Sequence, residues 1–189
     1  MAEINVAIIV GSNRRESINR KLALALAKLA EGKLAGHIVQ IDDLPMYNQD
    51  LDNALPASVH RFKSEIERAD AVLFVTPEHN RSIPAVLKNA IDWGTRPYGR
   101  NSWTSKIAAI TGTSPGGAGT AVAQQHLRQI LGNQGVLVMG GEAYINFKRD
   151  LISESHQITD ENSRQFLQAF ADRFAALAIQ HTRANIGAA

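Results

Sequence analysis

The fold of this chain is decided by residues 4–19, which read Ile-Asn-Val-Ala-Ile-Ile-Val-Gly-Ser-Asn-Arg-Arg-Glu-Ser-Ile-Asn. The run Ile4–Val10 is almost wholly apolar and has the length of a strand that is buried on both faces. A polar turn follows it, and apolar residues then recur from Ile18 to Leu29 at the spacing of an amphipathic helix. This stretch therefore predicts a buried strand that leads through a short turn into a helix.

The turn within this stretch suits a phosphate group. The N-terminus of a helix presents unpaired backbone N–H groups and the positive end of the helix dipole, and both attract anions. Ser12, Arg14, Ser17 and Asn19 add side-chain donors. The turn lacks the Gly-x-x-x-x-Gly-Lys-[Ser/Thr] and Gly-x-Gly-x-x-Gly patterns of triphosphate and dinucleotide sites. We therefore expect it to hold one terminal phosphate. The alternative is a plain strand–helix connection in which Ser17 is only a helix cap.

The rest of the chain repeats the alternation of strand and helix. Further strands are predicted at His37–Ile41, Ala71–Thr76, Lys106–Thr111 and Val136–Met139. Further helices are predicted over 59–69, from Pro84, over 122–131 and from near Thr159, the last with an inner stripe of Phe166, Phe170, Phe174 and Leu177. Five apolar strands, each followed by a helix, indicate a parallel sheet with helices on both faces. We expect one three-layer α/β domain over residues 1–182 and a frayed tail at 183–189.

The composition excludes several classes of function. The formal charge is only +2 and the basic residues are scattered, which argues against nucleic-acid binding. The chain has no cysteine, which rules out disulfides and thiol chemistry, and no His-Glu-x-x-His motif, so we expect no metal site. The Gly-x-Ser-x-Gly motif of α/β-hydrolases is also absent. No leader or apolar run of membrane-spanning length is visible, so we expect a cytoplasmic protein without membrane contact.

Two further polar loops follow the third and fourth predicted strands. In the loop 77–84, prolines at both ends restrict the backbone, which suits contact with the edge of a flat heteroaromatic ring. In the loop 111–119, Ser114, Gly116 and Gly117 allow close approach of a ligand. Because ligands of such sheets bind beyond the carboxyl ends of the strands, we expect these loops to gather with the first turn. The alternatives are an ordinary polar connection and a plain flexible turn.

Together these segments resemble the NAD(P)H-dependent FMN reductase family, in particular its quinone and chromate reductases. The resemblance rests on three motifs: Gly11-Ser12-x-Arg14-x-x-Ser17-x-Asn19, Leu44-Pro45-x-Tyr47-Asn48-x-Asp50-Leu51 and Pro77-Glu78-His79-Asn80-x-Ser82-x-Pro84-x-x-Leu87-Lys88-Asn89-Ala90-Ile91-Asp92-Trp93. It implies a flavodoxin-like fold with strand order 2-1-3-4-5 and non-covalently bound FMN. It also implies NAD(P)H as electron donor and a homodimer or homotetramer.

The resemblance implies particular site residues as well. Those implied for the FMN phosphate are Ser12, Arg14, Ser17, Ile18 and Asn19, with Ile18 acting through its backbone N–H. Those implied for the isoalloxazine ring are Pro77, Glu78, His79, Asn80, Ser82, Ser114, Gly116 and Gly117. Family members often carry tyrosine where this chain has His79, which affects aromatic packing but not recognition by the backbone. We expect no catalytic side chain, because the flavin carries the chemistry.

The implied reaction is a ping-pong cycle. NAD(P)H delivers a hydride to the flavin N5 and leaves, and a small acceptor such as a quinone then takes its place. Arg81, Arg96 and Arg100 are candidates for the phosphates of the nicotinamide cofactor, from their charge and position. The alternative from another class is a flavodoxin-type electron carrier that docks to protein partners, although such carriers are strongly acidic. A flavin-binding sensor or assembly protein is a third reading.

Overall fold

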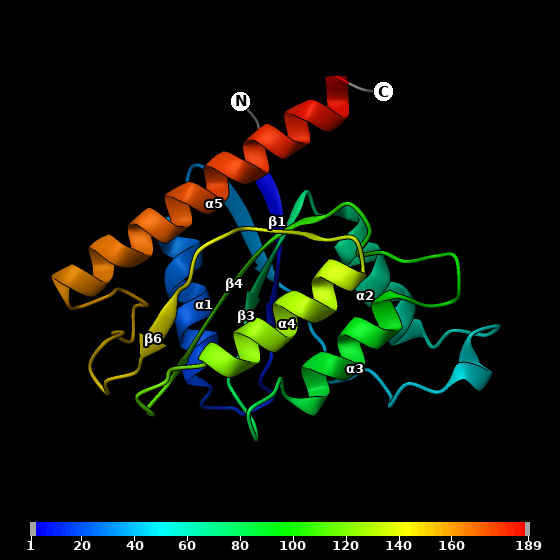
Figure 1. The fold of residues 1–189 in the computed structure, drawn as a ribbon, viewed down its shortest axis with the longest axis horizontal. Coiled ribbons are helices and arrows are strands. Elements are labelled where there is room, and N and C mark those ends of the chain that lie inside the picture. Colours follow the sequence, from blue (N-terminus) through cyan, green and yellow to red (C-terminus); the bar gives the residue numbers. More distant parts are fainter. Residues whose placement is uncertain (1–2, 188–189) are drawn as a thin grey trace.

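The computed structural model describes residues 3–187, which form six strands and five α-helices (Figure 1). The strands are β1 (Ile4–Val10), β2 (Leu34–Ile38), β3 (Ala71–Val75), β4 (Ile107–Ser114), β5 (Leu137–Val138) and β6 (Tyr144–Asn146). The helices are α1 (Ile18–Leu29), α2 (Ala57–Arg68), α3 (Ala85–Gly94), α4 (Ala121–Asn133) and α5 (Glu161–Gly187), with a 3₁₀ turn at Gln49–Leu51.

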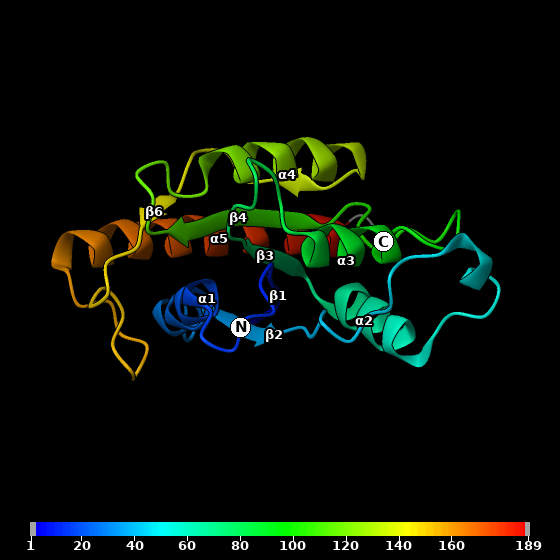
Figure 2. The same cartoon turned by 90° about the horizontal axis from the view of Figure 1, so that it is seen from below.

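The strands form one parallel sheet in the order β2-β1-β3-β4-β5, which confirms the predicted flavodoxin-like arrangement. Helices α1 and α5 pack on one face of the sheet and α2, α3 and α4 on the other. Figure 2 shows β2, β1, β3 and β4 stacked in order between α1 and α2. Successive strand residues therefore enter different cores. Ile8 packs in the core beneath α1 and α5, whereas Ile9 packs in the core beneath α2, α3 and α4.

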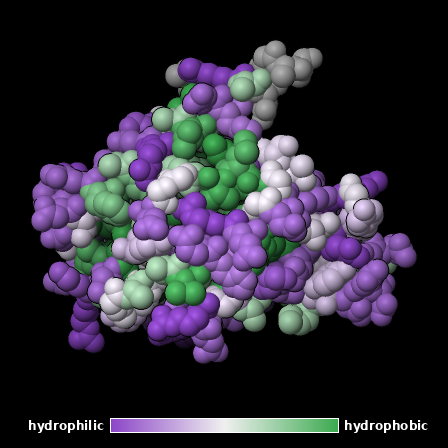
Figure 3. All heavy atoms as spheres, viewed as in Figure 1, coloured by the Kyte–Doolittle hydropathy of each residue, from purple (hydrophilic) through white to green (hydrophobic). Residues whose placement is uncertain are grey.

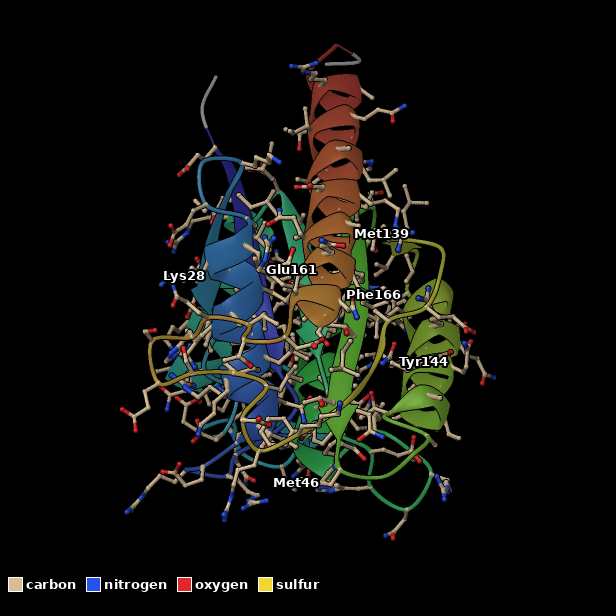
Figure 4. The ribbon with its side chains drawn as sticks, turned by 90° about the vertical axis from the view of Figure 1, so that its left-hand side faces the viewer. Lys28, Met46, Met139, Tyr144, Glu161 and Phe166 are labelled. Carbon is tan, nitrogen blue, oxygen red and sulfur yellow. The ribbon has the colours of Figure 1, made fainter. Side chains whose placement is uncertain are left out.

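The outer edge of the sheet is built from two short strands placed end to end along β4. β5 pairs with the start of β4, and β6, which the sequence did not predict, pairs with its last three residues. Two buried threonines of β4 hold this edge. The hydroxyl of Thr111 donates to the Ala143 carbonyl and that of Thr113 to the Ile145 carbonyl, both at 2.8 Å. Tyr144 of β6 reaches α4 (Figure 4), where Gln125 Nε2 donates to its hydroxyl at 2.8 Å.

The second and fifth strands differ in extent from the prediction. β2 lies three residues earlier than the predicted His37–Ile41. Val39 and Ile41 are buried, but they lie beyond the strand in a connection that packs into the core. The Val39 N–H still donates to the Ile8 carbonyl of β1 at 3.0 Å, but the apolar pattern beyond it reflects burial of the connection. β5 is shorter than the predicted Val136–Met139.

Other element boundaries differ by a few residues. β4 continues through Gly112 to Ser114, a stretch that the sequence assigned to a turn. Pro84 has extended backbone and caps α3 instead of being its first residue. The last helix begins at Glu161, close to the predicted start near Thr159, and Glu161 lies in its first turn as predicted. Asp160 lies just before the helix and caps it, because its carboxylate accepts the Ser163 N–H at 2.8 Å.

The buried face of α5 is rotated from the predicted stripe. Phe166 was expected inside but is 48% exposed. The buried face instead runs through Leu167, Phe170, Phe174 and Ala178, of which Phe170 and Phe174 were predicted. Apolar surface also gathers between α5 and α4, where β5 lies (Figure 3), and Leu137 there is 56% exposed.

The C-terminal helix is longer than expected. α5 continues to Gly187, so residues 183–187, predicted as part of a frayed tail, are helical. Residues 188–189 of that prediction lie outside the described residues. None of the helices within residues 3–187 is long and apolar enough to span a membrane.

Candidate functional site

The turn between β1 and α1 presents free hydrogen-bond donors. Ser17 caps α1, since its hydroxyl accepts the Arg20 N–H at 3.2 Å. Ser12 Oγ accepts the Arg14 N–H at 3.4 Å. Within residues 3–187 the backbone N–H groups of Ile18 and Asn19 have no hydrogen-bond partner. Two unpaired N–H groups at the positive end of a helix, beside two hydroxyls and a guanidinium, fit a phosphate.

Asn19 has a different role from the one expected of its side chain. It is buried, its Nδ2 donates to the Thr113 carbonyl at 3.0 Å, and its Oδ1 accepts the Thr113 N–H at 2.9 Å. Both ends of the amide are therefore occupied in a tie between the start of α1 and the end of β4. Only the backbone N–H of Asn19 remains available to an anion.

Glycines allow the three central strands to close up at this edge. A Cβ on Gly112 would lie 2.0 Å from the Thr76 carbonyl oxygen and 2.5 Å from Thr120 Oγ1. A Cβ on Gly11 would lie 2.8 Å from Thr76 Oγ1. No side chain fits at such distances, so Thr76, just after β3, is enclosed by Gly11, just after β1, and by Gly112 of β4.

The loop after β3 is a tight hairpin. The His79 N–H donates to the Ser82 carbonyl at 3.0 Å, and the Ser82 N–H donates to the His79 carbonyl at 2.9 Å. The two residues at its tip, Asn80 and Arg81, have φ values of 51° and 62°. Asparagine tolerates this left-handed conformation, but arginine adopts it at a cost in backbone strain. Strained backbone of this kind is typical of sites that hold a ligand.

Side chains fix this hairpin to the helix after β4. The side chain of Glu78 is 8% exposed, and its Oε2 accepts the Ala123 N–H in the first turn of α4 at 3.1 Å. Its Oε1 pairs with Arg81 Nη1 at 2.7 Å. Ser82 Oγ lies 2.8 Å from Nδ1 of His126, also on α4. The negative carboxylate at the positive end of α4 locks the loop in place.

A cleft of about 420 Å³ lies between this hairpin and the glycine loop after β4, and we refer to it as the β3–β4 cleft. It is lined by Glu78, Asn80, Arg81 and residues 114 and 116–119. The Gly116 N–H donates to Ser114 Oγ at 3.0 Å, and a Cβ on Gly117 would meet no atom within 4 Å. The structure thus brings five predicted ring-binding residues together, whereas Pro77, His79 and Ser82 lie in the hairpin without lining the cleft.

A second cleft lies beside the β1–α1 turn, and two of its lining residues, Ser12 and Arg14, were predicted to bind the phosphate. This β1–β2 cleft has a volume of about 480 Å³. Ser12 and three arginines, Arg14, Arg15 and Arg20, line one wall, and residues 38–42 at the end of β2 line the other. The arginines were visible in the sequence, but the cleft depends on where β2 ends, and that boundary was misplaced.

Two of the arginines proposed for nicotinamide phosphates are already paired. Arg96 Nη2 contacts Asp52 Oδ2 at 2.6 Å, and its guanidinium lies 5.5 Å from the centre of the Tyr47 ring. Arg81 is paired with Glu78. These contacts reduce the charge that Arg81 and Arg96 can offer to a ligand.

The third, Arg100, lies in the connection after α3, which Lys63 anchors. Lys63 Nζ donates to the carbonyls of Gly94 and Arg100 at 3.2 and 2.8 Å and to Ser102 Oγ at 2.6 Å. Burial lowers the pKa of Lys63. The backbone at Arg100 is therefore fixed by a structural contact.

Comparisons with known proteins identify the family of this chain. Residues 4–150 match the family model described as NADPH-dependent FMN reductase. The chain is 50% identical over 174 residues to a quinone reductase of Pseudomonas putida, covering 91% of this chain and 93% of the relative. It is 45% identical over 174 residues to a 2-hydroxy-1,4-benzoquinone reductase of Burkholderia sp, covering 92% of this chain and 95% of the relative.

A solved structure is similar over nearly its whole length. FerB, a flavoenzyme NAD(P)H:(acceptor) oxidoreductase from Paracoccus denitrificans, superposes with a TM-score of 0.91 and 49% identity, covering 94% of this chain and 98% of FerB. The chain therefore belongs to the NADPH-dependent FMN reductase family and is an oxidoreductase that uses FMN and NAD(P)H.

Proposed function

We propose that this protein reduces quinones with NAD(P)H. The observation that carries the proposal is the pair of unpaired N–H groups at the start of α1, which follows β1 at the β1/β3 switch point of the sheet. A glycine-lined cleft between the loops after β3 and β4 lies at the same edge of the sheet. The relatives named quinone reductase support the choice of acceptor. Bound FMN supplies the redox chemistry by taking up two electrons from the nicotinamide and passing them to the acceptor.

The residues of the β1–α1 turn would hold the FMN phosphate. We assign Arg14, the hydroxyls of Ser12 and Ser17, and the backbone N–H groups of Ile18 and Asn19 to this role. The Ser17 hydroxyl accepts a hydrogen bond within α1 and keeps its own proton for the ligand. The side chain of Asn19 would position the turn without touching the phosphate.

The isoalloxazine ring would lie against the hairpin after β3 and the glycine loop after β4. Because the side chain of Glu78 is occupied by α4 and Arg81, this loop would contact the ring through its backbone. The fixed hairpin would orient the ring, and the glycines Gly116 and Gly117 would let the backbone approach it closely. We assign no acid, base or nucleophile to a side chain.

The proposal also covers the oligomeric state of the protein and its location in the cell. We propose a homodimer or homotetramer, for which the exposed apolar surface around Leu137 is consistent with contact to a second copy. We also propose a cytoplasmic location, where reduced nicotinamide cofactors are available. Light scattering of the purified protein would test the first proposal, and fractionation of cells would test the second.

The proposed function is tested by the spectrum and turnover of the purified protein. We expect the absorption bands of an oxidised flavin, and NAD(P)H oxidation with a benzoquinone well above the rate given by the same concentration of free FMN. Bound flavin without turnover above that rate would point instead to an electron carrier. The absence of flavin uptake at micromolar FMN would contradict the whole assignment.

A further inference from the structure

The hairpin after β3 carries an arginine at a position where the backbone favours glycine. The two residues at its tip, Asn80 and Arg81, have φ values of 51° and 62°, so both are left-handed. Tips of this kind favour asparagine followed by glycine, because glycine adopts a left-handed backbone without strain. Arginine at the second position strains the backbone, and strain of this kind gathers at functional sites.

The contacts of Arg81 within the protein do not account for this strain. Its Nη1 pairs with Glu78 Oε1 at 2.7 Å, but the Arg81 side chain is 72% exposed, and ion pairs at such exposure contribute little to stability. The Glu78 carboxylate is also held by the Ala123 N–H at 3.1 Å, so it does not depend on Arg81 alone. The strain therefore points to a contact of the arginine side chain outside the folded chain.

The guanidinium of Arg81 keeps free hydrogen-bond donors at the β3–β4 cleft. Arg81 lines this cleft together with Glu78 and the glycine loop after β4. An arginine has five N–H donors, and within residues 3–187 neither Nε nor Nη2 of Arg81 has a hydrogen-bond partner. Since Glu78 balances its charge, Arg81 offers these donors to a molecule in the cleft without attracting anions strongly.

We propose that Arg81 donates a hydrogen bond to a carbonyl oxygen of the quinone while the quinone is reduced. This inference rests on the proposed function, because it names the residue that contacts the acceptor. A hydride from the bound flavin, which is oxidised in this step, is added to one carbonyl oxygen of the quinone. Both C=O double bonds then become single bonds, the ring becomes aromatic, and the second oxygen is left with a negative charge.

Arg81 contacts this second oxygen. The oxygen finally takes a proton from water, which completes the hydroquinone, and Arg81 stays protonated throughout. The oxygen carries little charge in the bound quinone and a full charge after the hydride has been transferred. A donor placed there therefore binds the transition state more strongly than the quinone itself, and such interactions raise the rate more than the affinity.

Anaerobic stopped-flow measurements on the FMN-loaded protein separate the two half-reactions. We expect Arg81→Ala and Arg81→Gly to lower the limiting rate of flavin reoxidation by 1,4-benzoquinone about tenfold, less than for a donor in a closed active site because Arg81 is exposed. The benzoquinone concentration that gives half of this rate should change by less than about twofold. The chain has no cysteine, so benzoquinone meets no thiol that it could alkylate.

The rate of flavin reduction by NADPH is the internal control. Loss of a hydride leaves a positive charge on the nicotinamide, which a hydrogen-bond donor cannot stabilise. Both variants should therefore reduce the flavin within about twofold of the wild-type rate. Arg81→Lys keeps the charge but lacks the planar fork of donors, so its reoxidation rate should lie between those of the wild type and Arg81→Ala.

The stability of the two variants distinguishes a contact with the quinone from a merely structural role. Both lack the guanidinium, but glycine fits the left-handed backbone and alanine does not. Arg81→Gly should therefore unfold at a higher denaturant concentration than Arg81→Ala, while the two reoxidise at the same rate. If Arg81 only shaped the hairpin, the rate would follow the stability and Arg81→Gly would be the faster variant.

His156 provides the matched control variants. It also has a left-handed backbone, with φ of 61°, and lies between β6 and α5 without lining either cleft. His156→Gly should likewise unfold at a higher denaturant concentration than His156→Ala. Both should be reoxidised by benzoquinone at the wild-type rate.

The outcomes separate this inference from the proposed function. Reoxidation of Arg81→Ala and Arg81→Gly by benzoquinone at the wild-type rate would overturn the inference, while quinone reduction by the protein would still stand. An equal loss in the rate of flavin reduction by NADPH would also overturn it, because Arg81 would then shape the flavin site as a whole. Failure of the wild-type protein to pass electrons to benzoquinone would overturn the inference and the proposed function together.

Discussion

The two clefts at the carboxyl edge of the sheet are built in opposite ways. Around the β3–β4 cleft nearly every polar side chain is bonded within the protein: Glu78 to α4 and Arg81, Asn19 to Thr113, and Ser82 to His126. In the β1–β2 cleft the charged side chains have no partners in residues 3–187. The first offers a fixed backbone surface and the second offers free charge.

This difference matches what each cleft has to recognise. A flat ring with polar edges is best held by backbone groups whose positions are set in advance, because no ordering is then needed on binding. A phosphate is held by charge and tolerates long, mobile side chains. Mutations should therefore damage folding and flavin binding at the first cleft, and only anion binding at the second.

The largest effect is expected from Gly112→Ala. The new Cβ would lie 2.0 Å from the Thr76 carbonyl oxygen, a backbone atom that cannot move without shifting β3. We expect a loss of about 3 kcal/mol in the free energy of unfolding, measured with denaturant, and weaker FMN retention. Gly132→Ala is the matched control, since its Cβ would meet no atom within 4 Å and alanine favours the helix. Equal stability of the Gly112 variant and the wild type would show that the close approach of Gly112 to Thr76 is not needed.

Asn19→Ala should have the next largest effect. It leaves the buried N–H and carbonyl of Thr113 without partners, which should cost about 2 kcal/mol of stability. Because Asn19 holds the start of α1 against β4, FMN should also bind more weakly. Asn13→Ala, in the exposed part of the same turn, should change stability by less than about 0.5 kcal/mol. If Asn19→Ala changed neither stability nor FMN binding, the hydrogen bonds between Asn19 and Thr113 would be dispensable.

Glu78→Gln should have a smaller effect. The amide can still accept the Ala123 N–H, but it loses the favourable charge at the start of α4 and the ion pair with Arg81. We expect a loss of about 1 kcal/mol in thermal or denaturant unfolding. Glu31→Gln, an exposed acidic residue after α1, serves as control and should be neutral.

The smallest effect on stability is expected in the β1–β2 cleft. Arg15→Ala and Arg20→Ala remove no contact, so stability should change by less than about 0.5 kcal/mol. Thermal unfolding without nucleotide would measure this. A large loss in either variant would show that these arginines support the fold, and the contrast between the clefts would disappear.

Local sequence patterns predicted most of the fold. β1 and β3 are continuous apolar runs, and the helices have one apolar face, so both were located closely. A pattern of apolar residues indicates that the residues are buried, but it does not show where a strand ends. Because Val39 and Ile41 are buried, the second strand was predicted too far along the chain. The end of β4 was missed because glycine, threonine and serine there look like turn residues. β6 was missed because its three residues are too few to show an alternating pattern.

The site could be predicted only in part, because the contacts that hold its loops in place are not local in the sequence. The three loops carry recognisable residues, and parallel topology places them at one edge. The contacts that fix them join residues far apart in sequence, such as Asn19 with Thr113 and Glu78 with Ala123. No local pattern encodes these pairs. The β1–β2 cleft depends likewise on two strand ends that are distant in the chain.

The central claim is that the turn between β1 and α1 holds the phosphate of FMN, and comparing FMN with riboflavin tests it most directly. Flavin fluorescence gives the Kd of each for the apoprotein of the wild type, Arg14→Ala and Ser17→Ala. We expect the wild type to bind FMN at least about tenfold more tightly than riboflavin, and both variants to lose most of that preference. Equal affinity of the wild type for the two flavins, or an unchanged preference in both variants, would contradict the account.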